Sequence, residues 1–141
     1  MKQVYISNIN SAFSARAKAR LGEEIEVTYE NILNKKHTVT APWILVSMGD
    51  IDTEPFTLGS GGLDINRGST KLDFFYPLNE GLSPIIKGMD QAREVFNIGV
   101  ELSEGGTVAT VTRLNQSRYT RGHASFRSAL QVFWTALTQR E

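Results

Sequence analysis

The sequence predicts an α+β fold: a single mixed or antiparallel sheet of about five to six strands, with two helices packed on one face. Three observations predict it. Two segments repeat apolar residues at helical spacing, several segments alternate polar and apolar residues, and glycines or prolines separate most of them. The expected order is α-β-β-β-α-β-β-β, and 141 residues suit a single domain over 1–141.

The first predicted helix runs from Val4 to Leu21. Its apolar stripe has helical spacing and consists of Ile6, Ile9, Phe13, Ala17 and Leu21. Gly22 follows where a C-cap is expected, and basic side chains in the last turns complement the helix dipole.

Three strands are expected next. Glu24 to Tyr29 alternates polar and apolar residues, which predicts a half-buried strand. Trp43 to Val46 is continuously apolar, which is typical of a central strand covered on both faces. Thr70 to Tyr76 predicts a further strand, stopped by Pro77.

The segment between Gly49 and Gly68 has no periodicity and contains Pro55 and the glycine-rich stretch Gly59 to Gly62. We expect an unstructured connection that is disordered in the free monomer, although the segment can also belong to a wide hairpin. Because connections of this length are uncommon in compact domains, a functional role is expected.

The second helix has an apolar stripe formed by Ile85, Ile86, Met89, Ala92, Val95 and Phe96. Ser83 is expected as N-cap, Pro84 as the first helical residue and Gly99 as terminator. Residues 99–102 and 107–114 then predict a β-hairpin. The last segment, Ala124 to Thr138, places its apolar residues at even positions, which favours a strand, although its alanines and leucines let a helix compete.

Composition limits the function. Apolar residues make up 40% and charged residues 21%, as in folded globular proteins. Fifteen basic and fifteen acidic side chains cancel, so nonspecific nucleic-acid binding is not expected, and copies do not repel one another. The absence of cysteine excludes disulfides and thiolate chemistry. The sequence shows neither a signal peptide nor a membrane-spanning run, so we expect no membrane association.

The residues that could carry chemistry form no familiar site. His37 and His123 each lack a second ligand at metal-binding spacing and are better interpreted as solvated loop histidines. The Gly59 to Gly62 stretch could cradle a phosphate, but it lacks the lysine and hydroxyl residue of a nucleotide-binding loop. Asp50, Asp52 and Glu54 are spaced for a calcium or magnesium site, but a solvated acidic edge is the simpler interpretation.

One locally basic and aromatic stretch extends from Arg113 to Arg127. It contains Arg113, Arg118, Tyr119, Arg121, Phe126 and Arg127 and no acid. This composition is typical of a surface for an acidic partner or a nucleic acid, or of an ordinary exposed hairpin tip.

Taken together, several short blocks resemble the tail terminator (tail completion) family of long-tailed phages. These blocks are the N-terminal helix, Val27 to Ile32, Pro42 to Val46 with the glycine-rich loop, Phe74 to Pro77, the helix ending at Phe96, the Gly105-Gly106 hairpin and the last strand. The final strand and the arginine-rich hairpin are longer than the family pattern.

The resemblance implies a structural virion protein without enzymatic activity or cofactor. It implies a ring, usually hexameric, that caps the tail tube, ends its polymerisation and offers a surface to head-completion or neck proteins. DNA would pass through the ring without sequence-specific binding. The implied location is the head-proximal end of the virion tail, after assembly in the host cytoplasm.

Physical reasoning, not the family, selects the interface candidates. They are charged or apolar residues of the long connection and of the arginine-rich stretch: Asp50, Asp52, Glu54, Phe56, Leu58, Leu63, Arg67, Arg113, Arg118, Tyr119, Arg121 and Arg127. Two other functions remain open: a different head-tail connector or tail tube subunit, and a small hydrolase or nucleotide-binding enzyme.

Overall fold

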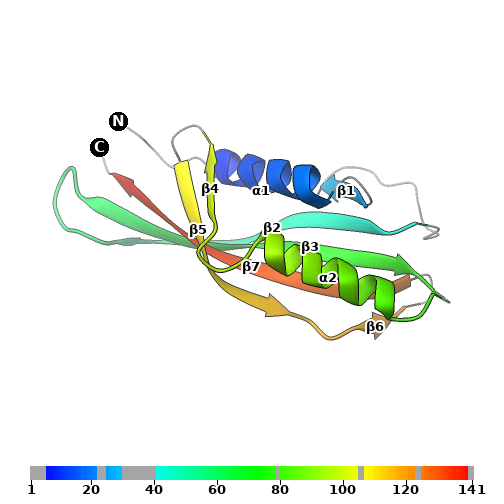
Figure 1. Cartoon of the computed structure of the whole chain (residues 1–141). Helices are drawn as coiled ribbons and strands as arrows, with labels where there is room; N and C mark the ends of the chain where they lie inside the picture. Colours follow the sequence, from blue (N-terminus) through cyan, green and yellow to red (C-terminus); the bar gives the residue numbers. More distant parts are fainter. Residues whose placement is uncertain are drawn as a thin grey trace.

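The computed structural model describes residues 6–21, 25–29, 41–78, 80–104, 107–122 and 125–139. Its elements are α1 (Ile6–Leu21), β1 (Glu26–Tyr29), β2 (Trp43–Pro55), β3 (Leu63–Pro77), α2 (Ser83–Val95), β4 (Glu101–Glu104), β5 (Thr107–Gln116), β6 (Thr120–Arg121) and β7 (Ser125–Gln139) (Figure 1). The α+β class is confirmed. The sheet has seven strands rather than five or six, because the two-residue β6 interrupts the connection from β5 to β7.

The sheet has the order β1-β2-β3-β7-β5-β4, with β6 beside β7. β1 pairs parallel with β2 and the remaining pairs are antiparallel, so the sheet is mixed. β3 and β7 are paired from Leu63↔Gln139 to Pro77↔Ser125. This long central ladder brings the carboxyl-terminal strand into the middle of the molecule.

Both helices and one face of the sheet contribute to a single hydrophobic core. α1 contacts β1, β4 and β5, α2 contacts β3 and β7, and the helices contact each other. Phe13 of α1 stacks on Phe96, with ring centroids 5.5 Å apart. The predicted stripe of α1 is buried at Ile9, Phe13, Ala17 and Leu21. Gly22 and the side chain of Ile6 lie outside the described residues.

One polar contact ties the two helices together. The Nε of Arg16 in α1 donates a hydrogen bond of 2.7 Å to the carbonyl oxygen of Val95, at the end of α2. A cation at this position complements the negative carboxyl end of the helix dipole. Burial, with a smaller contribution from nearby Arg20, lowers the pKa of the Arg16 guanidinium, which stays charged because arginine titrates far above neutral pH.

The second helix is confirmed, but both of its predicted ends are wrong. Leu82 occupies the N-cap position without a side-chain cap, and Ser83 is already helical. The helix ends at Val95 with Phe96 as C-cap, so Gly99, whose φ is +91°, belongs to the following turn. Gly88 lies against the ring of Tyr76, where a Cβ would meet the phenolic oxygen, so close packing explains this mid-helix glycine.

Two strand predictions have different outcomes. The last segment is a strand whose even positions Leu130, Val132, Trp134 and Ala136 are buried, as the alternation predicts. In β2, however, Ile44 and Val46 are buried while Trp43 and Leu45 are only partly covered. The expectation of a strand covered on both faces is therefore wrong, because Ile44 and Val46 face the hydrophobic core while Trp43 and Leu45 lie on the opposite, more open face.

The unstructured connection expected between Gly49 and Gly68 is also wrong, and the alternative of a wide hairpin is confirmed. Residues 49–55 belong to β2 and residues 63–68 to β3, and the two strands pair from Ile51↔Gly68 to Pro55↔Asp64. Only the turn between Pro55 and Leu63 is without strand structure. The strands continue a ladder that already joins Trp43 to Phe75, so pairing between distant residues extends the hairpin despite the glycine content.

Candidate assembly surfaces

The distal part of the β2–β3 hairpin, residues 50–67, is called the arm. It points to the end of the molecule opposite β6 (Figure 1). Its turn is built by glycines and local hydrogen bonds. Gly59 and Gly61 have φ of +91° and +74°, and the amide of Leu63 donates to Oγ1 of Thr57 at 2.6 Å. The amide of Phe56 donates to the carbonyl of Leu63 at 2.8 Å. The arm therefore presents a structured tip.

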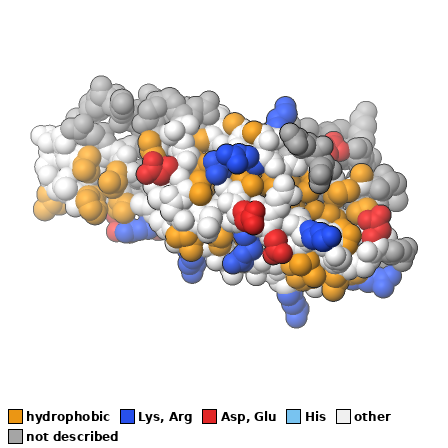
Figure 2. All heavy atoms as spheres, in the orientation of Figure 1, with side chains coloured by type: hydrophobic (Ala, Val, Ile, Leu, Met, Phe, Trp, Pro, Cys, Tyr) orange, Lys and Arg blue, Asp and Glu red, His pale blue; other side chains and the backbone are white. Residues whose placement is uncertain are grey.

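The tip of the arm exposes large apolar side chains. Phe56 is 59% exposed and Leu58 is 90% exposed, whereas Leu63 is half-buried at the base of the turn. Hydrophobic side chains gather at this end of the molecule in Figure 2. Exposed apolar groups on a projecting, ordered turn are typical of a contact surface.

The arm is also acidic. Asp50, Asp52, Glu54 and Asp64 are its acids and Arg67 is its one base, giving a net charge of −3. Arg67 Nη1 and Glu54 Oε1 are 3.1 Å apart and form an ion pair on one face of the arm. For Asp50 and Asp52 the described residues supply no ion pair. These two carboxylates are thus available to an outside partner.

The outer edge of β2 is open along the arm. β1 pairs with β2 only from Glu26↔Trp43 to Tyr29↔Val46. Among the described residues, no strand borders β2 on this side from Ser47 to Pro55. An unpaired edge is a template for pairing with another chain unless a protein covers it.

Two bulges lie at the same level of the sheet, one on each side of the β3–β7 pair. In β2 the register shifts between Met48 and Ile51, and in β5 it shifts between Val111 and Arg113. Glycine suits position 49 in the first bulge, since a Cβ on a larger residue there would clash with Oγ of Ser69. Since bulges bend a strand and increase its twist, they account for a hollow at this level.

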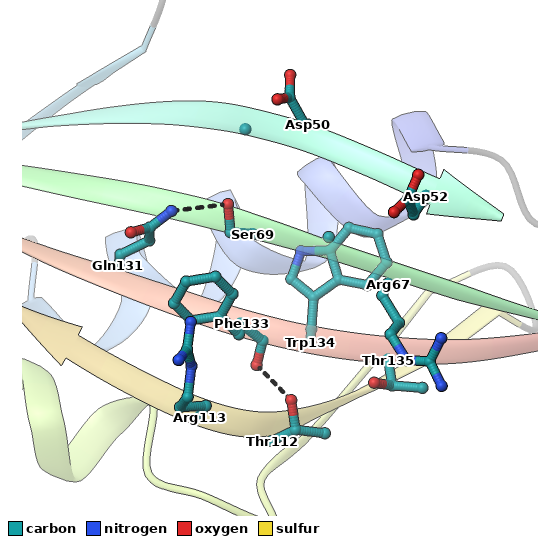
Figure 3. A pocket seen from close by; sticks show the side chains of 12 residues that line it. Asp50, Asp52, Arg67, Ser69, Thr112, Arg113, Gln131, Phe133, Trp134 and Thr135 are labelled. Atoms are coloured by element: carbon teal, nitrogen blue, oxygen red, sulfur yellow. Dashed lines mark hydrogen bonds between the residues drawn. The ribbon is translucent and has the colours of Figure 1, made fainter.

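The hollow has a volume of about 740 Å³ and lies on the open face of the sheet, away from the helices (Figure 3). Asp50 and Asp52 line it from β2, and Arg113 from β5. The guanidinium of Arg113 lies 4.0 Å above the ring of Phe133. Gln131 Nε2 donates to Ser69 Oγ at 3.2 Å on its floor. The hollow is open, has both polar and apolar lining and carries charges of both signs, which suits a protein surface better than a small molecule.

The basic stretch lies mainly at the other end of the molecule. Arg121 and Arg127 line a second hollow of about 510 Å³, and Arg118 is exposed beside it. Arg127 lies 5.0 Å from the ring centroid of Phe75, and Phe75 in turn stacks on Trp43 at 4.1 Å. These rings hold the Arg127 guanidinium on the open face by a cation–π contact.

The Arg113 to Arg127 segment is therefore not a simple hairpin tip. Arg113 belongs to β5, Arg121 to β6 and Arg127 to β7. Tyr119 is half-buried against the core, and its hydroxyl accepts a hydrogen bond of 2.9 Å from Gln116 Nε2. Its phenol ring supports the connection and exposes little surface, whereas the arginines are exposed.

The described residues hold no group of three or more histidine, aspartate or glutamate side chains placed to bind a metal ion. Asp50 and Asp52 do lie together, but Glu54 is engaged by Arg67. His37 and His123 lie outside the described residues. Within the described chain, no helix is long and apolar enough to cross a membrane.

Some surface residues escaped the sequence prediction. On the open face, Arg113 lies over Phe133, and Arg127 lies over Phe75, which in turn stacks on Trp43. The floor of the first hollow is formed by Ser69 and Gln131. A signal was present for Phe133, because it is an aromatic residue at an odd, otherwise polar position of the final strand. In the sequence, only Gly49 indicates a bulge.

Comparison with known protein families decides the class of this molecule. The family model described as phage tail terminator protein matches residues 8–134. The chain belongs to the phage tail terminator family. It is thus a structural protein of the phage tail, and its location is the virion.

Solved structures show the same fold at low sequence identity. One, whose title gives no function, is 16% identical, with a TM-score of 0.69 over 99% of this chain and 100% of that one. Another, titled as the virion of a native gene transfer agent particle, is 17% identical, with a TM-score of 0.54 over 93% and 92% of the two chains. None of the curated proteins matches the chain.

Proposed function

We propose that the protein caps the phage tail tube as an oligomeric ring, most simply a hexamer, and thereby ends polymerisation of the tube. The same ring provides the attachment surface for a head-completion or neck protein at the head-proximal end of the tail. DNA passes through it without sequence-specific binding, and assembly takes place in the host cytoplasm. The observation that carries the proposal is the family match over residues 8–134.

The surfaces described above support a ring. A head-to-tail ring requires two different surfaces on each subunit, repeated around the axis. The projecting acidic arm and the Arg118–Arg127 segment are such a pair of unlike surfaces. Zero net charge removes the long-range repulsion that would oppose the gathering of several copies.

The experiment is a capping assay with the cognate tail tube protein. The purified chain is added while the tube protein polymerises, and tube lengths are measured by electron microscopy. A terminator shortens the tubes in proportion to its concentration and is found at one tube end. Incorporation along the tubes, or formation of long tubes by the chain alone, would instead identify a tube subunit.

Two variants sharpen this assay. The first replaces turn residues 57–62 with Asn-Gly, which keeps the paired strands of the arm but removes Leu58 from its tip. It should fold, since the removed side chains lie outside the core, and it should lose capping activity. The control is Lys18→Ala on the exposed side of α1, which should cap like the native protein. Normal capping by the variant with the shortened arm would show that the tip of the arm is not needed for capping.

A further inference from the structure

The two ends of the molecule carry opposite charge, although the whole chain is neutral. The arm has a net charge of −3, from four acids and one base. Residues 118–127 contain Arg118, Arg121 and Arg127 and no acid, giving +3 with His123 neutral. In Figure 1 the arm extends to one end of the molecule and β6, which contains Arg121, lies at the other.

Two charged residues at each end have no ion-pair partner among the described residues. Asp50, Asp52, Arg118 and Arg121 are exposed, and none forms an ion pair with another described residue. Elsewhere on the open face the chain does pair its charges, as with Lys71 and Asp73 at 3.7 Å. Unpaired like charges gathered at one place are therefore a feature of the two ends.

Apolar surface accompanies the charge at both ends. Phe56 and Leu58 are exposed at the arm tip. At the opposite end, Leu82 is 44% exposed and Ile86 38% exposed, one turn apart at the start of α2, which lies toward the same end as β6 (Figure 1). An apolar centre with a charged rim is the usual composition of a protein interface.

From this complementarity we infer that the acidic arm of one copy docks on the Arg118–Arg127 end of the next copy, head to tail. Asp50 and Asp52 would face Arg118 and Arg121, while Phe56 and Leu58 would cover the apolar start of α2. The inference rests on the proposed ring function and names the contact that builds the ring. A second copy is the favoured occupant because the two ends carry opposite charge and each exposes apolar surface.

The electrostatic part of this contact must be sensitive to salt. The Debye length is about 8 Å at physiological ionic strength and about 3 Å at 1 M, so exposed charge pairs weaken as salt rises. The dissociation constant between subunits should therefore rise several-fold over this range. The apolar part of the contact should keep assembly from disappearing altogether.

A charge-swap series tests the contact, with oligomer mass measured by analytical ultracentrifugation of the full chain. One variant carries Asp50→Lys and Asp52→Lys, and the second carries Arg118→Glu and Arg121→Glu. The third combines all four changes. Arg127 is left unchanged, because its stacking on Phe75 is part of the fold. Circular dichroism verifies that each variant is folded, and a matched control, Glu94→Lys with Glu101→Lys, changes two exposed acids that lie in the last turn of α2 and in β4, outside both ends.

Each of the first two variants brings like charges together and should weaken assembly by roughly ten- to a hundred-fold. The third variant restores attraction with reversed sign, so it should recover most of the native assembly, and the control should assemble normally. Rescue by the combined variant excludes misfolding as the cause of the loss.

Three results would overturn the contact: native assembly of both single-end variants, no recovery in the combined variant, or equal loss in the control. These outcomes differ from failure of the proposed function. If the native chain forms no ring, alone or with tube protein, the ring itself is wrong. If the native ring forms and charge reversal leaves it intact, only the docking of the arm is wrong.

Discussion

The close approach of Gly68 and Trp134 gives the sharpest test of the packing. The two residues are cross-strand partners in the β3–β7 ladder, and Trp134 is 1% exposed. A Cβ on Gly68 would lie 2.5 Å from Cζ2, 2.9 Å from Cη2 and 3.0 Å from Cε2 of the indole. Although both residues border the hollow on the open face, the indole is almost fully buried and its neighbours limit its movement, so Gly68→Ala should strain the centre of the sheet.

The expected cost follows from two opposing effects. Overpacking of this kind destabilises by about 1–3 kcal/mol, and the lower freedom of alanine in the unfolded chain returns about 0.4–1 kcal/mol. The net loss is about 1–2 kcal/mol in the free energy of unfolding. For a domain of this size the melting temperature should fall by roughly 3–8 °C. Urea unfolding and thermal unfolding, both followed by circular dichroism, measure the two quantities.

A double-mutant cycle separates this contact from a general intolerance of the strand. Trp134→Phe removes the indole atoms that a Cβ at residue 68 would meet, and it also removes a buried Nε1 that has no hydrogen-bond partner among the described residues. In that background Gly68→Ala should cost about 1 kcal/mol less than in the native protein. Equal cost in both backgrounds, or a native-like Gly68→Ala protein, would show that contact between a Cβ at residue 68 and the Trp134 indole does not limit this position.

Three further predictions concern the helices and the arm. Arg16→Ala should lower the free energy of unfolding by about 1 kcal/mol in urea titrations, because the carbonyl of Val95 loses its charged donor, whereas Lys18→Ala, on the exposed side of α1, should change it by less than about 0.5 kcal/mol. Gly88→Ala should destabilise by about 1 kcal/mol in thermal melts despite the better helix propensity of alanine, since its Cβ meets the hydroxyl of Tyr76; a raised melting temperature would contradict this. In hydrogen exchange, the paired strands of the arm should be protected and its turn should exchange fast; equally fast exchange throughout would show that the arm is unpaired in the free chain.

The sequence was sufficient for elements whose pattern is local. The stripe from Ile9 to Leu21 and the even positions of the last strand each reflect a single buried face, so periodicity located both. The ends of α2 were less accessible. A serine before a proline is a strong N-cap signal, yet the helix begins at Ser83 itself, and Leu82 is an N-cap without a side-chain hydrogen bond.

The sequence indicated the arm only as an alternative to an unstructured connection, because its strands are held by each other and by β7 rather than by a buried face. Along the arm β2 is largely exposed, so no alternation of polar and apolar residues marks a buried face there. The bulge beside Gly49 also shifts the register, which breaks the period. Candidate residues were found on both surfaces because charge runs are visible in a sequence, but their placement at opposite ends required the topology.

We propose that this phage tail protein acts as a closed ring. Light scattering across a concentration series, with the chain alone and then with tail tube protein, tests this directly. A closed ring of six subunits should reach a mass plateau near 94 kDa, about six times the 15.7 kDa chain, and should not grow further. A strict monomer at every concentration, with and without tube protein, or a mass that grows without limit, would contradict it.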